Sequence, residues 1–384
     1  MNKPFFLLFL VSCVFRLFAQ ETTFKTNGPD DFREGKHAFT NATIFVSYNK
    51  KIDSATLYIQ DGKIVKVEHS SSPSAEQSAG WIIHDMSGKF IYPAFIDIFS
   101  DYGMPEVVKP KYNENPQLES NIKGAYGWNE AIHTDFYSSK NFAVNDKSAD
   151  ELRKLGFGAV LTNRKDGIAQ GTGSLVTLAT DKENFVLIKP DVSANYSFNK
   201  GSSTQDYPES LMGKIALLRQ TYYDAQWYAA VHSLPLGEGR GGAEYNINLE
   251  EWNKQQSLVQ IFDAGNNWMK IVRADKIGDE FGVQYIIKGG GDDYQRIDEI
   301  KNTKAKIIVP LNFPKAYDVE DPYQANMITL AEMKNWELAQ SNCAALHQAA
   351  IDFTITAYRL KNKENLLTSL RKLVKYGLDS TIAL

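Results

Sequence analysis

Residues 88–101 read Gly-Lys-Phe-Ile-Tyr-Pro-Ala-Phe-Ile-Asp-Ile-Phe-Ser-Asp, and this stretch decides the fold. The apolar run over residues 95–99 is interrupted only by Asp97, and it ends at the polar residues Ser100 and Asp101. A short apolar run bounded by polar residues is typical of a buried strand. We therefore predict that a strand enters a core here and stops at its polar end.

The residues before this strand predict a small sheet. Residues 42–47, 55–60 and 63–69 are rich in β-branched and aromatic residues with partial alternation. Asp61 and Gly62 join the last two runs, and an Asp-Gly pair between such runs is a strong hairpin signal. Residues 81–85 and 89–92 are expected to complete an antiparallel sheet.

The residues after it alternate between strands and helices. Predicted strands cover residues 95–99, 157–162, 258–262, 284–288, 306–311 and 353–356, and predicted helices cover 148–155, 208–231, 249–256, 268–281, 292–301 and 363–376. Residues 174–179 and 185–189 are expected to form a hairpin inserted on the rim. Apolar strands that alternate with helices favour a parallel sheet covered by helices. A doubly wound sheet is the second candidate, but the first strand lacks a Gly-x-Gly-x-x-Gly turn.

The segment from Asp61 to Asp97 resembles the first part of the amidohydrolase superfamily, with Asp61-Gly62-Lys63-Ile64 followed by Gly88-Lys89-Phe90-Ile91-Tyr92-Pro93. It is most similar to the exported, imidazolonepropionase-related subgroup of Bacteroidetes-type bacteria. The resemblance implies a (β/α)₈ TIM-type barrel, complete or lacking its C-terminal end, with a small antiparallel β-sandwich piece before it. The last residues, 377–384, resemble the start of a helix that continues in the family, which predicts a fragment of a longer protein.

The resemblance also implies a metal site, and here the sequence departs from the family. The family places His-x-His after its first strand, where this chain has Phe99 and Asp101. No histidine follows the strand that ends at Lys288, and the last predicted strand ends in Thr356-Ala357-Tyr358 without the carboxylate that the family has after strand 8. The family uses zinc to activate a water. We predict no metal ligands and no cofactor in this chain.

Five residues are candidates for the site. Asp97 matches the family's aspartate, and Asp101 offers an oxygen ligand in place of the second histidine; a cap or an ion pair at the rim is the plainer role for both. His133 and His232 fall in expected rim insertions that could reach the barrel mouth. Lys288 precedes Gly-Gly-Gly-Asp-Asp, which is either a backbone nest for an anion or a flexible loop.

The N-terminus predicts export. Lys3 precedes an apolar stretch over residues 5–18 that is too short to span a bilayer, and Ala19-Gln20 resembles a cleavage site. We predict a signal peptide at 1–20, a mobile leader at 21–36, the small sheet at 37–92 and the barrel at 93–384, in a periplasmic or secreted protein without stable membrane insertion after cleavage. A lipoprotein anchored at Cys13 is the alternative.

The composition and charge of the chain limit the classes of molecule that it is expected to bind. The chain has 384 residues, a formal charge of -4 and no long basic run, which argues against nucleic-acid binding. A small amide-like ligand is expected, and a homo-oligomer or a second amidohydrolase domain is left open as a partner. Two functions remain: a hydrolase of non-peptide, cyclic C–N bonds, or a non-catalytic barrel that serves as a binding or scaffolding module for another domain.

Overall fold

The computed structural model describes residues 35–47, 49–69, 80–108, 115–117, 119–120, 122, 129–232, 244–360 and 365–383. The expected signal peptide, nearly all of the leader and the glycine-rich segment 237–242 lie outside these residues. The chain divides into two compact units, Met1–Pro93 and Ala94–Leu384. None of the helices in the described part is long and apolar enough to cross a membrane.

The first unit is a five-stranded sheet. Its strands are β1 (Lys36–Ser47), β2 (Lys50–Gln60), β3 (Lys63–Glu68), β4 (Ile82–Asp85) and β5 (Phe90–Ile91), in the order β3-β2-β1-β4 with β5 also on β1. The turn between β2 and β3 has positive φ at Asp61 and Gly62, as the Asp-Gly signal predicts. The expectation of a wholly antiparallel sheet is wrong, because β4 and β5 pair with β1 in parallel.

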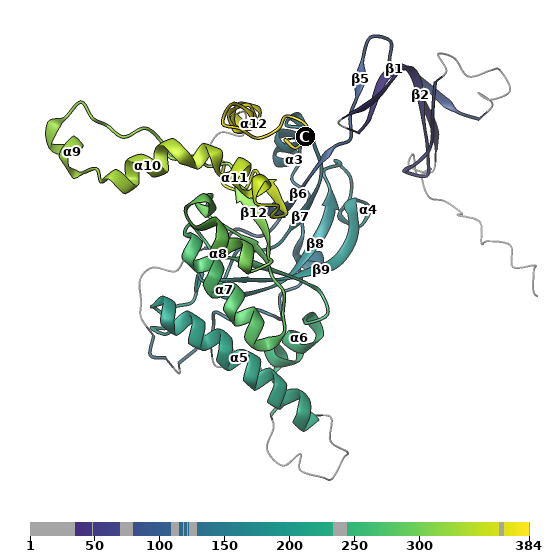
Figure 1. The fold of residues 1–384 in the computed structure, drawn as a ribbon. Coiled ribbons are helices and arrows are strands. Elements are labelled where there is room, and N and C mark those ends of the chain that lie inside the picture. Colours follow the sequence, from purple (N-terminus) through teal and green to yellow (C-terminus); the bar gives the residue numbers. More distant parts are fainter. Residues whose placement is uncertain are drawn as a thin grey trace, which may run out of the picture. The chain divides into compact units, whose positions relative to one another are not determined.

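The second unit is built around an eight-stranded sheet. Its strands are β6 (Phe95–Ser100), β7 (Phe157–Thr162), β8 (Ala169–Thr177), β9 (Leu187–Ser197), β10 (Val259–Asp263), β11 (Ile286–Lys288), β12 (Lys306–Pro310) and β13 (Phe353–Thr356), neighbours in that order. Seven of them run parallel, and β8 runs against its neighbours β7 and β9. The sheet curls into a nearly closed barrel (Figure 1), so the TIM-type architecture is confirmed at this level.

Strands β8 and β9 lie in a different place from the one expected. Residues 174–179 and 185–189 were expected to form a hairpin on the rim, but β8 and β9 lie within the sheet itself. β13 is therefore the eighth strand of the sheet but only the seventh parallel one. By parallel order, Thr356-Ala357-Tyr358 does not correspond to the end of the family's eighth strand, and its lack of a carboxylate says nothing about that position.

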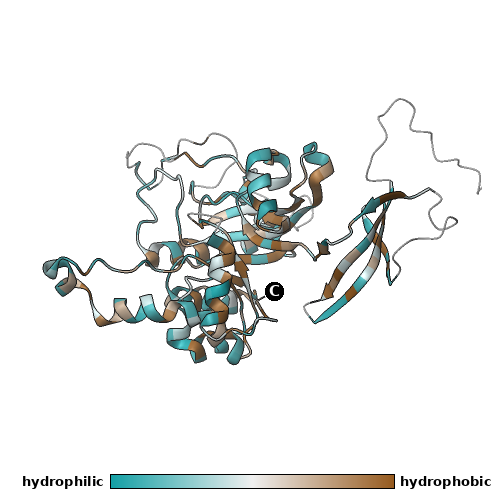
Figure 2. Cartoon of the chain, turned by 90° about the horizontal axis from the view of Figure 1, so that it is seen from above, coloured by the Kyte–Doolittle hydropathy of each residue, from teal (hydrophilic) through white to brown (hydrophobic). Residues whose placement is uncertain are grey.

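Helices connect the strands of the second unit. They are α2 (Ser138–Asn141), α3 (Asp146–Lys154), α4 (Glu183–Val186), α5 (Leu211–His232), α6 (Ile247–Gln255), α7 (Trp268–Phe281), α8 (Ile297–Asn302), α9 (Pro322–Met327), α10 (Leu330–Leu338), α11 (Asn342–Gln348) and α12 (Leu366–Lys375), with short 3-10 turns η3 (Asp293–Arg296) and η4 (Ala339–Ser341). The buried faces of α3, α5, α6, α7, α8, α11 and α12 share one large core with the outer faces of the strands. Helices α9 and α10 have no buried residue and extend away from the barrel in Figure 1. In Figure 2 the helices carry hydrophilic as well as hydrophobic residues around their circumference, as expected of helices with one buried face.

A second, smaller core fills the inside of the barrel. Phe99 of β6, Leu161 of β7, Ile261 of β10 and Ile308 of β12 are all buried there, together with Tyr358, which follows β13. Side chains from alternate strands pack in layers in such barrels. Phe99, at the position where the family has its first histidine, is thus part of this inner packing.

Candidate active site at the barrel mouth

Polar side chains gather where the parallel strands end. Asp101 follows β6, Lys165 follows β7, Asp263 ends β10 and Lys288 ends β11. Because the carboxyl ends of parallel barrel strands meet at one face, this face holds the active sites of barrels of this kind. We call these four residues, with Phe99 beneath them and Tyr358 beside them, the barrel mouth.

Lys165 lies at the centre of the mouth. Its Nζ is 3.3 Å from the centroid of the Phe99 ring and 5.4 Å from that of Tyr358. A lysine ammonium over an aromatic face is attracted by the ring's negative face. The same Nζ donates a hydrogen bond to Oδ1 of the buried Asn163 at 2.5 Å. The amine is therefore positioned by two contacts, one with the Phe99 ring and one with the Asn163 side chain.

Burial changes the acidity of this amine. The residue is only half-buried as a whole, but protein surrounds its amine closely, and desolvation lowers the pKa of Lys165 to about 7. The carboxylates of Asp263 and Asp101 act in the opposite direction, and the Lys288 ammonium adds to the lowering. Since desolvation is the largest cause, close to half of the Lys165 side chains are neutral at pH 7.

Lys288 supplies a second cation. Its Nζ is 3.3 Å from Oδ1 of Asp263, and it donates a hydrogen bond to the carbonyl of Gly265 at 3.3 Å. The Lys288 side chain is 13% exposed and that of Asp263 is 23% exposed, so the pair is shielded from solvent. Lys288 also lies 6.0 Å from the Phe99 centroid. Of the predicted candidates, Lys288 and Asp101 therefore belong to the mouth.

Asp97 lies below the mouth and has a structural role. Its side chain is 2% exposed. Oδ1 accepts a hydrogen bond from the Phe99 amide at 3.0 Å, while Oδ2 accepts from the Ala357 amide at 2.9 Å and the Thr356 hydroxyl at 3.1 Å. Burial raises the pKa of Asp97, against the effect of these hydrogen bonds. Asp97 thus connects β6 to the end of β13, the two strands at the open edges of the sheet.

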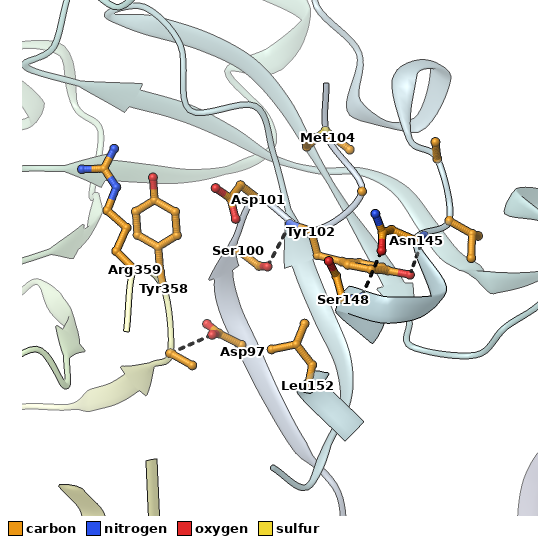
Figure 3. A pocket seen from close by; sticks show the side chains of 14 residues that line it. Asp97, Ser100, Asp101, Tyr102, Met104, Asn145, Ser148, Leu152, Tyr358 and Arg359 are labelled. Atoms are coloured by element: carbon orange, nitrogen blue, oxygen red, sulfur yellow. Dashed lines mark hydrogen bonds between the residues drawn. The ribbon is translucent and has the colours of Figure 1, made fainter. Parts of the chain in front are cut away.

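A cavity of about 390 Å³ opens beside this connection. Figure 3 shows Asp101 and the Tyr358 hydroxyl on the same side of it, with Asp97 deeper and Arg359 next to Tyr358. Burial raises the pKa of Tyr358 to about 12, and Asp101 contributes to the shift. The Tyr358 hydroxyl is therefore a hydrogen-bond donor at every physiological pH.

His133 lies apart from these residues. Its ring Nε2 is buried without a hydrogen-bond partner among the described residues, 3.8 Å from Oδ2 of Asp166. Burial, with the neighbouring Arg164, lowers the pKa of His133 to about 4, so the ring is neutral at pH 7. Asp166 instead accepts hydrogen bonds from the amide and hydroxyl of Ser202. No described contact joins His133 to the barrel mouth.

His232 is the last residue of α5 and not part of a rim insertion. Its ring centroid is 4.1 Å from that of Tyr228, one turn earlier on the same helix. A helix that follows a barrel strand runs back from the mouth toward the amino ends of the strands. The C-terminal end of α5 is therefore the end farther from the mouth, which places His232 outside the candidate site.

The residues at the mouth do not fit a zinc ion. Within the described part of the chain, no three histidine, cysteine, aspartate or glutamate side chains converge as a metal-ligand set. Zinc sites use nitrogen and sulfur donors in tetrahedral sets. Phe99, Tyr358, Asp101 and Asp263 offer the mouth a phenyl ring and oxygen atoms only, and the Asp263 carboxylate is paired with Lys288.

Lys165 was not a candidate from the sequence. It lies in Asn163-Arg164-Lys165-Asp166, a polar run that reads as an ordinary solvated loop. Its position directly after a predicted core strand is the signal that could have found it, because residues at the carboxyl end of a barrel strand face the site.

Comparison with known proteins supports the fold. The sequence matches no protein-family model and no curated protein. An amidohydrolase of known structure from Thermotoga maritima MSB8 has a TM-score of 0.68 at 18% identity, over 90% of this chain and 85% of that one. At this identity the likeness shows the fold alone, and it agrees with the expected TIM-type barrel.

Two further structures are less similar. An uncharacterized metal-dependent hydrolase from Pyrococcus furiosus has a TM-score of 0.45 at 12% identity, over 91% of this chain and 92% of that one. The A. niger ochratoxinase has a TM-score of 0.40 at 9% identity, over 91% and 82%. These scores are too low for an argument about this chain. The exported bacterial subgroup stays a prediction.

Proposed function

We propose that this chain hydrolyses a non-peptide C–N bond in a small molecule, a cyclic amide being the substrate that the family resemblance implies, without a metal at its barrel mouth. The observation that supports this most directly is the position of the Lys165 amine, held over Phe99 at the carboxyl ends of the strands. The fold shared with the Thermotoga amidohydrolase is an analogy of fold, so the proposal rests on the residues of the mouth.

The proposed chemistry uses the neutral form of Lys165 as a general base. The amine removes a proton from water, and the resulting hydroxide attacks the carbonyl carbon. The Lys288 ammonium and the Tyr358 hydroxyl stabilise the negative charge that develops on the carbonyl oxygen. The Lys165 ammonium then returns the proton to the departing nitrogen, which leaves a carboxylic acid and an amine.

The pH dependence follows from the Lys165 pKa of about 7. Below pH 7 the amine is protonated and cannot act as a base, so the rate should rise as pH increases through about 7 and then level off. Asn163 orients the amine through its side-chain oxygen. We expect Lys165→Met to remove activity altogether, because methionine keeps the length of the side chain but has no proton acceptor.

The test is turnover by the full chain on dihydropyrimidine, imidazolone and N-acyl amino acid substrates, with and without a metal chelator. Lys154→Met is the matched control, because Lys154 is an exposed lysine of α3 paired with Asp150. Activity that resists the chelator, disappears in Lys165→Met and persists in Lys154→Met would support the proposal. Activity lost to the chelator, or retained in Lys165→Met, would refute it.

The second function, a non-catalytic binding module, predicts ligand binding without turnover on any substrate of the panel. We also propose that the protein is exported, on the grounds of residues 1–20. Cleavage after Gln20, found by N-terminal sequencing of protein from the periplasm or medium, is the result expected. A mature N-terminus at Cys13 would instead support the lipoprotein alternative.

A further inference from the structure

A groove separate from the Lys165 amine lies over the ends of β12 and β13. It has a volume of about 890 Å³, within the usual range for sites that bind small molecules. Its walls come from four parts of the chain: residues 311–316 after β12, Trp336 and Gln340 in and after α10, residues 359–360 after β13, and residues 365–372 at the start of α12 and within it. Arg359, which follows β13, lies on both this groove and the cavity beside Asp101.

The charged residues of the groove all have the same sign. Lys315, Arg359 and Lys372 line it, and none of the described residues that line it has a carboxylate. Neither Lys315 nor Lys372 has an ion pair with a described residue in the structure. The whole chain has a formal charge of -4, so this cluster runs against the overall charge and makes a local site for an anion.

Helix α12 adds to the positive potential. Its N-cap residue Asn365 makes no side-chain capping hydrogen bond, and its first turn contains no acidic residue. Asn365, Thr368 and Ser369, all in or next to that turn, line the groove. The amide groups at a helix N-terminus favour an anionic group. The helix end and the three cationic side chains therefore favour the same kind of ligand.

The groove also offers aromatic surface. Trp336 is 40% exposed and Phe313 is half-buried, and both line the groove. A tryptophan that is partly exposed in a concave site can stack on a flat ring while the cations bind an anionic substituent. We propose that this groove binds a small aromatic molecule with a carboxylate or phosphate group. The proposal does not depend on hydrolysis at Lys165.

The experiment is isothermal titration of the full chain with phenylacetate, phenyl phosphate, the neutral phenylacetamide and the ringless acetate. We expect binding of one or both aromatic anions and at least about tenfold weaker binding of the amide and of acetate. The preference between the first two probes identifies the anionic group. Binding of phenylacetamide as tight as that of both anions, or binding of none of the four, would overturn the proposal.

Variants locate the site. Lys372→Met should weaken binding of the aromatic anion about fivefold, the effect of one exposed charge pair, and Trp336→Leu should weaken it to a similar degree. Lys375→Met is the matched control, because it removes the same charge from α12 at a position that does not line the groove. Equal weakening by Lys375→Met and Lys372→Met would show that only net charge matters and would defeat the assignment.

Discussion

The connection between β6 and β13 through Asp97 can be tested by Asp97→Ala. The substitution leaves the amides of Phe99 and Ala357 without their acceptor, while the Thr356 hydroxyl can turn to the Phe99 carbonyl at 3.0 Å. Each orphaned buried amide costs about 1–3 kcal/mol, and relief of the buried carboxylate offsets part of this, so we expect a loss of about 3 kcal/mol. The more conservative Asp97→Asn keeps one acceptor and should lose about half as much.

The assay is urea unfolding of the full chain, followed by tryptophan fluorescence and circular dichroism. Asp101→Ala is the matched control, because it makes the same chemical change four positions later at an exposed residue. The control should leave the midpoint within experimental error. If Asp97→Ala shifts the midpoint no more than Asp101→Ala does, Asp97 does not hold the strand edges together and the structural role assigned to it is wrong.

Three further predictions concern stability. Gly290→Ala should destabilise the fold by about 2 kcal/mol, since its Cβ would lie 2.6 Å from the Asn266 backbone; an unchanged midpoint would contradict this. Tyr222→Phe should cost about 1–2 kcal/mol by leaving the Tyr285 hydroxyl, now 2.6 Å away, without its partner, and adding Tyr285→Phe should restore part of the loss. Burial raises the pKa of Asp293 from 3.8 to about 6. The stability that the neutral carboxyl group contributes is therefore complete below about pH 4 and is lost as pH rises through 6. Asp293→Asn should remove this pH dependence, which urea midpoints from pH 4 to 7 would measure.

The barrel could be predicted because most of its strands are apolar runs with clear ends. Residues 95–99, 157–162 and 353–356 match β6, β7 and β13 closely. The hairpin expected at residues 174–179 and 185–189 covers only parts of β8 and β9, and residues 169–173 and 190–197 were missed because they are polar and contain glycine or proline. β8 contains Gly171 and Gly173, where a Cβ would lie 2.1 Å from the Phe136 carbonyl and 2.5 Å from Ser193 Oγ. Close approach of other chain segments requires these glycines, and a sequence does not show such contacts.

The loop after Lys288 illustrates the same limit. A run of three glycines predicts flexibility when it is read alone. In the structure Gly290 lies against the Asn266 backbone, and Gly289 lies where a Cβ would meet Oδ1 of Asp293 at 3.0 Å. The glycines are needed for packing between neighbouring loops, and Asp293 accepts a hydrogen bond from Asn342. These residues do not form the anion nest considered from the sequence, because the buried carboxyl group of Asp293 lies against Gly289.

The mouth was only partly predictable for a different reason. Asp101 and Lys288 follow strands that the sequence reveals, so both could be placed there. The environment of Lys165 depends on a ring and carboxylates from other strands, Phe99, Asp101 and Asp263. Burial of the amine and the charges of Asp101 and Asp263 together set its pKa. These effects come from residues far apart in the sequence, so no pattern in the sequence around Lys165 indicates them.

The replacement of the family's first histidine by Phe99 fits the presence of a lysine beside it. A phenyl ring cannot bind zinc, but its face attracts a cation, and Lys165 lies over that face at 3.3 Å. The Lys288 ammonium, and Lys165 when it is protonated, raise the free energy of a divalent cation there, while the carboxylates of Asp101 and Asp263 lower it. Exchange of Phe99 for histidine alone would therefore not create a zinc site, because it adds one nitrogen donor where zinc requires a tetrahedral set. The mouth combines two lysines with two carboxylates, and the amine of Lys165 is the group on which the proposed chemistry rests.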